Sequence, residues 1–305
     1  MLLPGRIGAL PRQPSRDSAI WRSPGQHARF SEYARRIAPL CKVILPMARI
    51  IQITDLHVLE DPQALLKGVN VRWFLERVVD QLLAQESDCD ALVITGDHTH
   101  DELESSYSYL RDLFAPWNDR LYQVPGNHDE RRILRSVFAS RISGRDDDLV
   151  QFAFEQSGWF CLGLDTHDSG NVSGLLTQGQ IAAARQQADA SGAERVAVFC
   201  HHPPVQLESE WMDAIGLHGA EHLRSWCESD PRLQLVCCGH VHHESQHTCG
   251  HATVLTTPST GVQFSPLGNV PNFVAGQPGY RVLELTEQGC STFVMRINDV
   301  ATPVP

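Results

Sequence analysis

The stretch Ala-Leu-Val-Ile-Thr-Gly-Asp at residues 91–97 constrains the fold of this chain more than any other segment. Its run of apolar and β-branched residues is typical of a strand that is buried on both faces. Gly96 allows a tight turn, and Asp97 then lies at the carboxyl end of a central strand, where open α/β sheets bind their ligands. Because the sequence places no obvious basic partner nearby, we expect a bound cation to balance this carboxylate.

Four other segments repeat the pattern of an apolar strand followed by polar residues. Each puts an oxygen or an imidazole at a predicted strand end: Asp55 and His57, Asn127 and His128, His201, and His240 and His242. One such segment would be weak evidence, but five of them in this order predict a shared site. Carboxylate, amide oxygen and imidazole without thiolate suit Mn, Fe or Zn and argue against a structural zinc site. We therefore expect Asp97 to bridge two metal ions.

Predicted strands and helices alternate along most of the chain, which is typical of an α/β fold. Strands are predicted at 48–54, 91–96, 120–124, 195–199 and 233–238, and a pair at 151–154 and 159–164 is expected to begin a second sheet. The tail segments 247–255, 280–285 and 291–297 are expected to form antiparallel strands. Apolar spacing predicts helices at 65–83, 104–114, 130–138, 178–190 and 219–227.

Residues 1–46 differ in composition from the rest of the chain. They are interrupted by prolines and carry a net charge of +6, whereas the remainder carries −17. An Arg-rich, acid-poor leader can be a transit peptide, but we favour translation from an upstream start codon, with Met47 as the working start. In either case we expect a disordered or mis-annotated leader at 1–46 and one domain at 47–305.

Composition limits the partners and the compartment. The overall net charge of −11 argues against a nucleic acid or an anionic membrane as a partner. Nine cysteines without any Cys-x-x-Cys pair predict reduced thiols in a cytoplasmic protein. No apolar run approaches the roughly 18 residues that a membrane-spanning helix needs.

The polar segments resemble the motifs of the calcineurin-like metallophosphoesterases. They appear here as Asp55-Leu-His57, Gly96-Asp97, Gly126-Asn-His-Asp129, His201-His-Pro-Pro204 and Gly239-His-Val-His242. Segments outside these motifs narrow the resemblance to bacterial class III 3′,5′-cyclic-AMP phosphodiesterases. These segments are 66–70, 210–217, 256–264 and 278–280. The resemblance covers about residues 50–297 and implies a four-layered α/β/β/α sandwich with its site at one sheet edge.

The resemblance also implies a role for each motif residue. One metal ion would take Asp55, His57, Asp97 and His242, and the other would take Asp97, Asn127, His201 and His240. Iron and manganese are favoured as the two ions, with zinc as an alternative. A hydroxide shared by the two ions would attack phosphorus in line. His128 would stabilise the transition state and help to protonate the leaving 3′-oxygen, and Asp129 would orient His128.

Several residues leave alternatives open. His202 is the second choice to His201 as a ligand, since the family's His-x-x-Pro spacing selects the first histidine, and we also consider His202 for the substrate. His98 stands where relatives usually carry an aliphatic residue, so it either fills that slot or supports the site from behind. Gly261 replaces a cysteine of close relatives. Surface or loop positions are favoured for six other histidines, at 100, 218, 222, 243, 247 and 251.

The resemblance implies a small cyclic nucleotide as the substrate. The expected reaction is hydrolysis of 3′,5′-cyclic AMP to 5′-AMP. Asn127 and His128 would contact its phosphate, and Trp211 or Phe264 would offer a face to the purine, although Trp211 could instead cap the core. A homodimer is one arrangement that we consider. Metal motifs cannot exclude other phosphodiesters or nucleotides as substrates, such as glycerophosphodiesters, 2′,3′-cyclic nucleotides or pyrophosphates. A non-catalytic scaffold is disfavoured because every ligand and the Asn-His pair are present.

Overall fold

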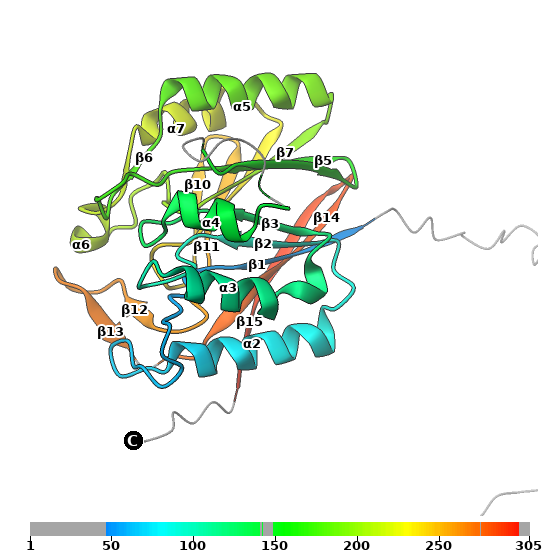
Figure 1. Cartoon of the computed structure of the whole chain (residues 1–305). Coiled ribbons are helices and arrows are strands. Elements are labelled where there is room, and N and C mark those ends of the chain that lie inside the picture. Colours follow the sequence, from blue (N-terminus) through cyan, green and yellow to red (C-terminus); the bar gives the residue numbers. More distant parts are fainter. Residues whose placement is uncertain (1–46, 141, 143–148, 275, 299–305) are drawn as a thin grey trace, which may run out of the picture. The chain divides into compact units, whose positions relative to one another are not determined.

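The computed structural model describes residues 47–140, 142, 149–274 and 276–298. The chain divides into two units, residues 1–44 and 45–305, and the predicted leader lies outside the described residues. Within the second unit, two β-sheets face each other and helices cover the outer side of each sheet (Figure 1). This arrangement confirms the expected four-layered α/β/β/α sandwich.

The first sheet has five strands, and three of them are parallel neighbours. β1 pairs in parallel with β2 and β2 with β3, whereas β14 is antiparallel to β1 and β15 is antiparallel to β14. Their spatial order and bounds are β15 (Gly289–Arg296), β14 (Gly279–Thr286), β1 (Ala48–Ile53), β2 (Ala91–Thr95) and β3 (Leu121–Val124).

The second sheet has six strands, of which the four inner ones are parallel. Their spatial order and bounds are β10 (Ser245–Cys249), β11 (Ala252–Thr256), β9 (Leu233–Cys238), β7 (Arg195–Cys200), β5 (Trp159–Leu164) and β4 (Phe152–Gln156). The prediction for 247–255 is wrong in part. This segment contains a hairpin, and its second strand, β11, runs parallel to β9 because it pairs with a strand distant in sequence.

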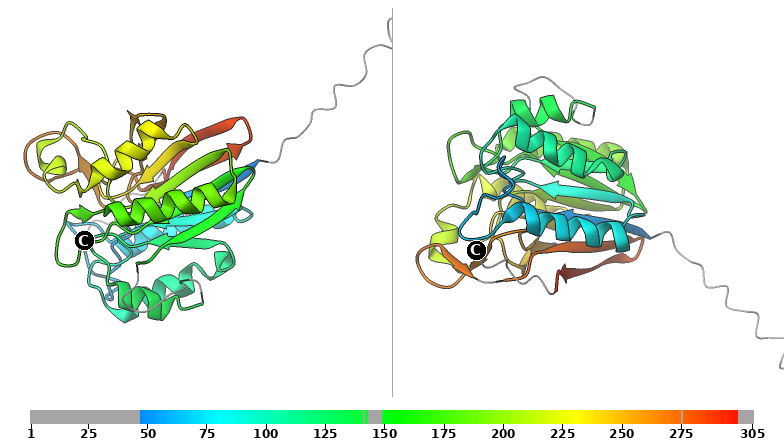
Figure 2. Two further views of the ribbon diagram at one scale, coloured as in Figure 1. Left: turned by 90° about the horizontal axis from the view of Figure 1, so that it is seen from above. Right: turned by 60° about the horizontal axis from the view of Figure 1, so that its bottom comes forward.

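Helices lie on the outer faces of both sheets. The views in Figure 2 show α5 across one face and α2 across the opposite one. The first sheet is covered by α2 (Val71–Gln85), α3 (Glu104–Leu113) and α4 (Arg131–Val137), and the second by α5 (Gln178–Ser191) and α7 (Ala220–Ser229). Short elements that the sequence did not predict are η1 (Ala115–Trp117), α6 (Glu210–Asp213), β6 (Gly174–Leu175), β8 (Leu217–His218), β12 (Gln263–Ser265) and β13 (Asn272–Val274). Among the described helices, none has both the length and the apolar character needed to cross a membrane.

Successive side chains of the central strands belong to two different hydrophobic cores. In β1, Ile50 belongs to the core between the two sheets, while Ile51 belongs to the core beneath α2 and α3. In β2, Val93 and Leu92 divide in the same way. Because successive side chains point to opposite faces, a strand covered on both sides must be apolar throughout. This explains the continuous apolar run before Asp97.

The start of α2 was predicted six residues too early. The helix begins at Val71, and the side chain of Asn70 caps it by accepting a hydrogen bond from the backbone N–H of Trp73 at 2.9 Å. Lys67 and Gly68 have positive φ angles of 51° and 82°, which a right-handed helix does not allow. The segment before Asn70 is therefore a loop, and it reaches towards the carboxyl ends of the strands.

Polar side chains connect the two sheets just below these strand ends. Gln52 Nε2 donates to Thr95 Oγ1 at 2.9 Å within the first sheet and to the carbonyl oxygen of Cys238 in the second sheet at 3.2 Å. Gln52 Oε1 accepts from Thr257 Oγ1 at 2.7 Å. All these groups are buried, so the hydrogen bonds fix the spacing of β1, β2 and β9 where the polar motifs begin.

Candidate metal centre

Left-handed backbone marks the strand ends that carry the motifs. Non-glycine residues rarely adopt positive φ, and such conformations cluster at functional sites where the surrounding structure enforces them. The turn at residues 55–57 is held in place by backbone hydrogen bonds. The N–H groups of Leu56 and His57 donate to the carbonyl oxygen of Asp97, at 2.8 and 2.9 Å. Five of the seven predicted metal ligands have positive φ: Asp55 (54°), His57 (47°), Asp97 (53°), His240 (73°) and His242 (52°).

Two motif glycines are required by close approach. A Cβ atom on Gly96 would lie 2.5 Å from Nδ1 of His201, and Gly96 also has a φ of 95°. A Cβ atom on Gly126 would clash with the carboxylate of Asp97. The glycines in Gly-Asp and Gly-Asn-His-Asp therefore allow neighbouring strand ends to converge on Asp97.

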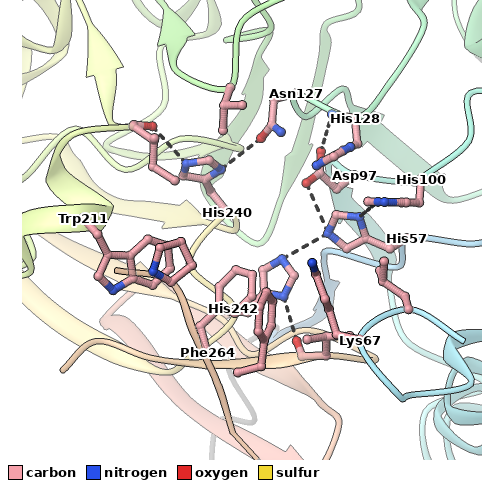
Figure 3. Close-up of a pocket in the computed structure, with 16 residues that line it drawn as sticks. His57, Lys67, Asp97, His100, Asn127, His128, Trp211, His240, His242 and Phe264 are labelled. Atoms are coloured by element: carbon pink, nitrogen blue, oxygen red, sulfur yellow. Dashed lines mark hydrogen bonds and ion pairs between the residues drawn. The ribbon is translucent and has the colours of Figure 1, made fainter. Parts of the chain in front are cut away.

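The first predicted ligand set comes together as a compact, buried cluster, and Figure 3 shows three of its members, His57, Asp97 and His242. Nε2 of His57 lies 3.1 Å from Nε2 of His242 and 3.4 Å from Oδ2 of Asp97. Oδ1 of Asp55 lies 3.3 Å from Nε2 of His242. Ligands bound at about 2.0–2.2 Å to one ion lie roughly 3.0–3.5 Å from their neighbours, so this donor set fits a metal ion.

The second predicted set shares the carboxylate of Asp97. Its Oδ2 atom lies 3.5 Å from Nε2 of His201, and this distance is similar to the 3.4 Å between Oδ2 and Nε2 of His57. Oδ1 of Asn127 lies 3.2 Å from Nε2 of His201 and 3.0 Å from Nδ1 of His240. The same spacing criterion is met here, and Asp97 stands between the two sets as a bridging ligand would.

Backbone carbonyl groups orient three of the four histidines that are predicted as ligands. His201 donates through Nδ1 to Thr95 at 2.7 Å, and His242 donates through Nδ1 to Val262 at 2.7 Å. His240 donates through Nε2 to the carbonyl oxygen of Ile215 at 3.0 Å. The remaining ring nitrogen of each histidine is then free to bind a cation.

His57 is oriented differently from the other three histidines. Its Nδ1 lies 3.3 Å from Nδ1 of His100, which also stacks on His128 with ring centroids 4.6 Å apart. No local pattern distinguished His100 from the other loop histidines. The chain after Asp97 runs parallel to the chain after His57, through a bridge between Thr99 and Val58, and this tertiary pairing brings His100 into the site.

Burial and neighbouring charges set the protonation of these groups. Burial lowers the pKa of His57 to about 3 and that of His240 to about 4, so both are neutral, as ligation requires. Burial opposes protonation of His201 as well, but the carboxylates of Asp97 and Asp55 raise its pKa to about 9. Burial would raise the pKa of Asp97, yet the surrounding histidines lower it well below its usual value. A buried carboxylate held ionised in this way is suited to a cation.

His202 lies outside the ligand set. Its ring is close to His201 and His240, but Nδ1 bonds to Oγ1 of Thr166 at 2.8 Å and Nε2 bonds to the carbonyl oxygen of Val172 at 3.0 Å. With both nitrogens used, His202 has no free donor for a metal ion, and it is absent from the described residues that line the cavity. The expectation that it binds substrate is therefore not supported, and its contacts brace the loop around Val172.

Asp129 was expected to orient His128, but its carboxylate points elsewhere. It accepts hydrogen bonds from the ring and the backbone of His98, from Tyr107 Oη at 3.0 Å and from the backbone N–H of Gly126 at 2.9 Å. Among the described residues, none of its bonds reaches the His128 ring. Asp129 therefore braces the 126–129 turn, and the backbone N–H of His128 bonds to Oδ1 of Asp97 at 2.8 Å.

His98 combines both alternatives left open by the sequence. Its ring is fully buried and lies 2.9 Å from Asp129 Oδ2 through Nδ1 and 3.0 Å from Gln123 Oε1 through Nε2. It thus fills an interior position with partners for both nitrogens. It also lies directly behind the turn that carries Asn127 and His128.

A cavity of about 220 Å³ opens beside the cluster of predicted metal ligands. One side is polar and contains five of the predicted ligands and His128, and the other is mainly apolar and includes Trp211 and Phe264. Phe264 stacks on His242 with ring centroids 4.1 Å apart, so one of its faces is already covered. Trp211 meets the edge of Phe264 and packs on Met212, so it both caps a small apolar cluster and lines the cavity.

Comparisons with known proteins agree with this geometry. The family described as calcineurin-like phosphoesterase matches residues 48–244. The chain is 32% identical over 256 residues to the 3′,5′-cyclic adenosine monophosphate phosphodiesterase CpdA of Pseudomonas aeruginosa, covering 84% of this chain and 92% of that protein. It is 30% identical to the protein of the same name from Escherichia coli K12, covering 84% of this chain and 94% of that protein.

Solved structures support the fold independently. A dimetal phosphatase from Danio rerio aligns with a TM-score of 0.58 at 15% identity, covering 82% of this chain and 99% of that chain. A purple acid phosphatase from yellow lupin seeds aligns with a TM-score of 0.58 at 11% identity, covering 83% of this chain and 52% of that chain. Sequence, fold and donor geometry agree, and the chain belongs to the calcineurin-like phosphoesterase family.

Proposed function

We propose that this protein is a phosphodiesterase with two metal ions that hydrolyses 3′,5′-cyclic AMP to 5′-AMP. The observation that carries the proposal is the position of Asp97 Oδ2, 3.4 Å from Nε2 of His57 and 3.5 Å from Nε2 of His201, between the two predicted donor sets. The adjoining cavity has a largely apolar side, as a nucleoside requires. Relatives at 30–32% identity that carry the name of this activity support the choice of substrate.

Two bound ions would activate the attacking water for in-line displacement and neutralise charge on the phosphoryl group. The chain's own residues position the substrate around them. Asn127 presents its amide beside the phosphate, and His128 lies on the same turn with its ring lining the cavity. A donor here stabilises the charge that develops on the phosphoryl oxygens and can protonate the departing 3′-oxygen.

The apolar side of the cavity would hold the nucleoside. Trp211 is 6% exposed and is held by its neighbours, so its surface is preorganised. Phe264 has one face on His242, which leaves its other face and its edges for contact with a ligand. Enclosure by these rings excludes water from the reacting groups and selects for a substrate with a planar base.

The donor set also bears on metal identity and location. Nitrogen and oxygen donors without a thiolate suit iron and manganese, which we propose as the two ions, with zinc as the alternative. The eight cysteines in the described part of the chain are free thiols, and seven of them are buried. These thiols support a reducing compartment, and we propose the cytoplasm. We also propose a homodimer as the oligomeric state.

The test is steady-state kinetics of protein loaded with manganese or iron. Substrates are cyclic AMP, cyclic GMP and bis(p-nitrophenyl) phosphate, and the metal-stripped protein serves as the control. We expect metal-dependent turnover with the highest kcat/KM for cyclic AMP. Hydrolysis of bis(p-nitrophenyl) phosphate without hydrolysis of either cyclic nucleotide would contradict the proposed substrate while leaving a metal-dependent phosphodiesterase in place.

A further inference from the structure

Lysine is rare in this sequence, and one lysine lies at the cavity. The chain has 25 lysine and arginine residues, but its only lysines are Lys42 and Lys67. Lys67 is also the only lysine or arginine among the described residues that line the cavity. Its ammonium group points into the cavity towards His57 and His242 (Figure 3).

The backbone places Lys67 in a conformation that lysine seldom adopts. Leu66 and Val69 exchange two backbone hydrogen bonds of 2.9 Å, so Lys67 and Gly68 form a two-residue turn. Their φ angles of 51° and 82° are those of a type I′ turn, in which Asn and Gly are preferred. A lysine in the left-handed region is an outlier, and its side chain is presented to the cavity by a rigid turn.

The charge of Lys67 has no carboxylate partner. Within the described part of the chain, its ammonium forms no ion pair, and its contact is with the Phe273 ring, 5.0 Å from the centroid. Phe273 belongs to β13 and lines the same cavity. A contact of this kind is weaker than a charge-assisted hydrogen bond to a phosphate oxygen, so an anionic ligand can draw the ammonium away from the ring.

We propose that Lys67 is a substrate-contacting residue whose ammonium binds a non-bridging oxygen of the phosphodiester. The inference rests on the proposed phosphodiesterase activity and adds a contact to it. Phe273 holds the ammonium at the cavity while no substrate is bound. Because negative charge on these oxygens increases in the transition state, a point charge here assists turnover as well as binding.

The first test compares two neutral variants with a charge-retaining one. Lys67→Asn removes the charge and tolerates the left-handed turn, Lys67→Met keeps most of the side-chain length, and Lys67→Arg keeps the charge. We expect both neutral variants to lower kcat/KM about ten- to a hundredfold for cyclic AMP and for bis(p-nitrophenyl) phosphate, with partial recovery in the arginine variant. Arg77→Gln, which removes an exposed charge on α2 outside the cavity, should leave both rates unchanged.

Bis(p-nitrophenyl) phosphate separates the outcomes. Loss of activity on cyclic AMP alone would overturn the phosphate contact and assign Lys67 to the nucleoside. Unchanged kcat/KM on both substrates would also overturn the inference. If wild-type protein hydrolyses only bis(p-nitrophenyl) phosphate, the cyclic-AMP proposal fails, while Lys67 is still judged on that substrate. If it hydrolyses neither substrate, both proposals fail.

The scarcity of lysine permits a second test on an otherwise unaltered site. In a Lys42→Arg background, Lys67 is the only side-chain amine. Acetylation removes its charge, whereas reductive dimethylation retains it. We expect acetylation to reproduce the loss in Lys67→Asn and dimethylation to preserve most activity. Protein with both lysines replaced by arginine, treated in the same way, controls for reaction at other groups. Equal losses after the two treatments would show that the charge is not what matters.

Discussion

Nε2 of His57 and Nε2 of His242 lie 3.1 Å apart, although the two residues are 185 positions apart in the sequence. Nδ1 of His242 donates to the carbonyl oxygen of Val262, so its Nε2 presents a lone pair towards His57. The carboxylate oxygens of Asp97 and Asp55 lie 3.4 and 3.3 Å from these two ring nitrogens, respectively. One cation among the four atoms satisfies all of them.

Replacing Asp97 should affect both metal sites together. In Asp97→Asn, a neutral amide replaces the carboxylate that both donor sets share, so the metal content should fall from two equivalents towards zero. Asp55→Asn is the matched control, because Asp55 belongs to one set and should cost mainly one equivalent. Metal analysis of the purified variants checks this. Two equivalents retained in Asp97→Asn would disprove the bridging role.

His128 should act on the reaction and not on metal binding. Its ring lines the cavity and lies beside His57 and His100, but it belongs to neither of the two predicted donor sets, so His128→Ala should keep its metals. We expect kcat to fall by about 10²–10³-fold with a smaller change in KM, as for loss of a transition-state donor. Kinetics and metal analysis of the same preparation provide the test. A metal-free or fully active variant would contradict this role.

Trp211 and Phe264 should determine nucleoside binding. Loss of a stacking surface typically costs about 1–3 kcal/mol, so Trp211→Ala should raise KM for cyclic AMP about ten- to a hundredfold. Bis(p-nitrophenyl) phosphate, which has no nucleoside, should be affected much less. Phe264→Ala is less selective, because Phe264 also covers His242. If both alanine variants change the two substrates equally, these residues are only structural.

His100 makes two contacts that substitutions can separate. His100→Phe keeps a ring beside His128 but removes the hydrogen-bond partner of His57, so chelator competition should show metal affinity reduced about 10–100-fold. His100→Gln keeps an acceptor for His57, so the metals should be retained. It removes the ring that stacks on His128, so kcat should fall. Equal metal affinities in the two variants would show that the contact with His57 does not support the site.

The convergence of these polar residues could be predicted from the sequence because each motif is local. A buried strand, a turn and one or two polar residues fit within about ten positions, and parallel strands bring such ends to one edge. Asp55, Asp97 and His242 were identified in this way, and the structure brings them together. The alternation that buries Ile50 and Ile51 on opposite faces follows from strand geometry alone.

Other features depend on tertiary contacts that local patterns do not contain. His100 enters the site through pairing between two loops, and Asp129 turns towards His98 because that ring occupies the interior beside it. The parallel direction of β11 follows from its distant partner β9. Lys67 stood in a segment already marked by the resemblance, but only the turn and the cavity show where its charge lies.

The most direct measurement of the central claim is the product formed from 3′,5′-cyclic AMP in water enriched in ¹⁸O. Manganese-loaded protein is used, with Asp97→Asn protein as the control, and products are identified by mass spectrometry. Attack of water on phosphorus with departure of the 3′-oxygen predicts 5′-AMP carrying one ¹⁸O atom in its phosphate, and none from the control. Formation of 3′-AMP, absence of ¹⁸O from the phosphate, or no product from the wild-type protein would contradict the account.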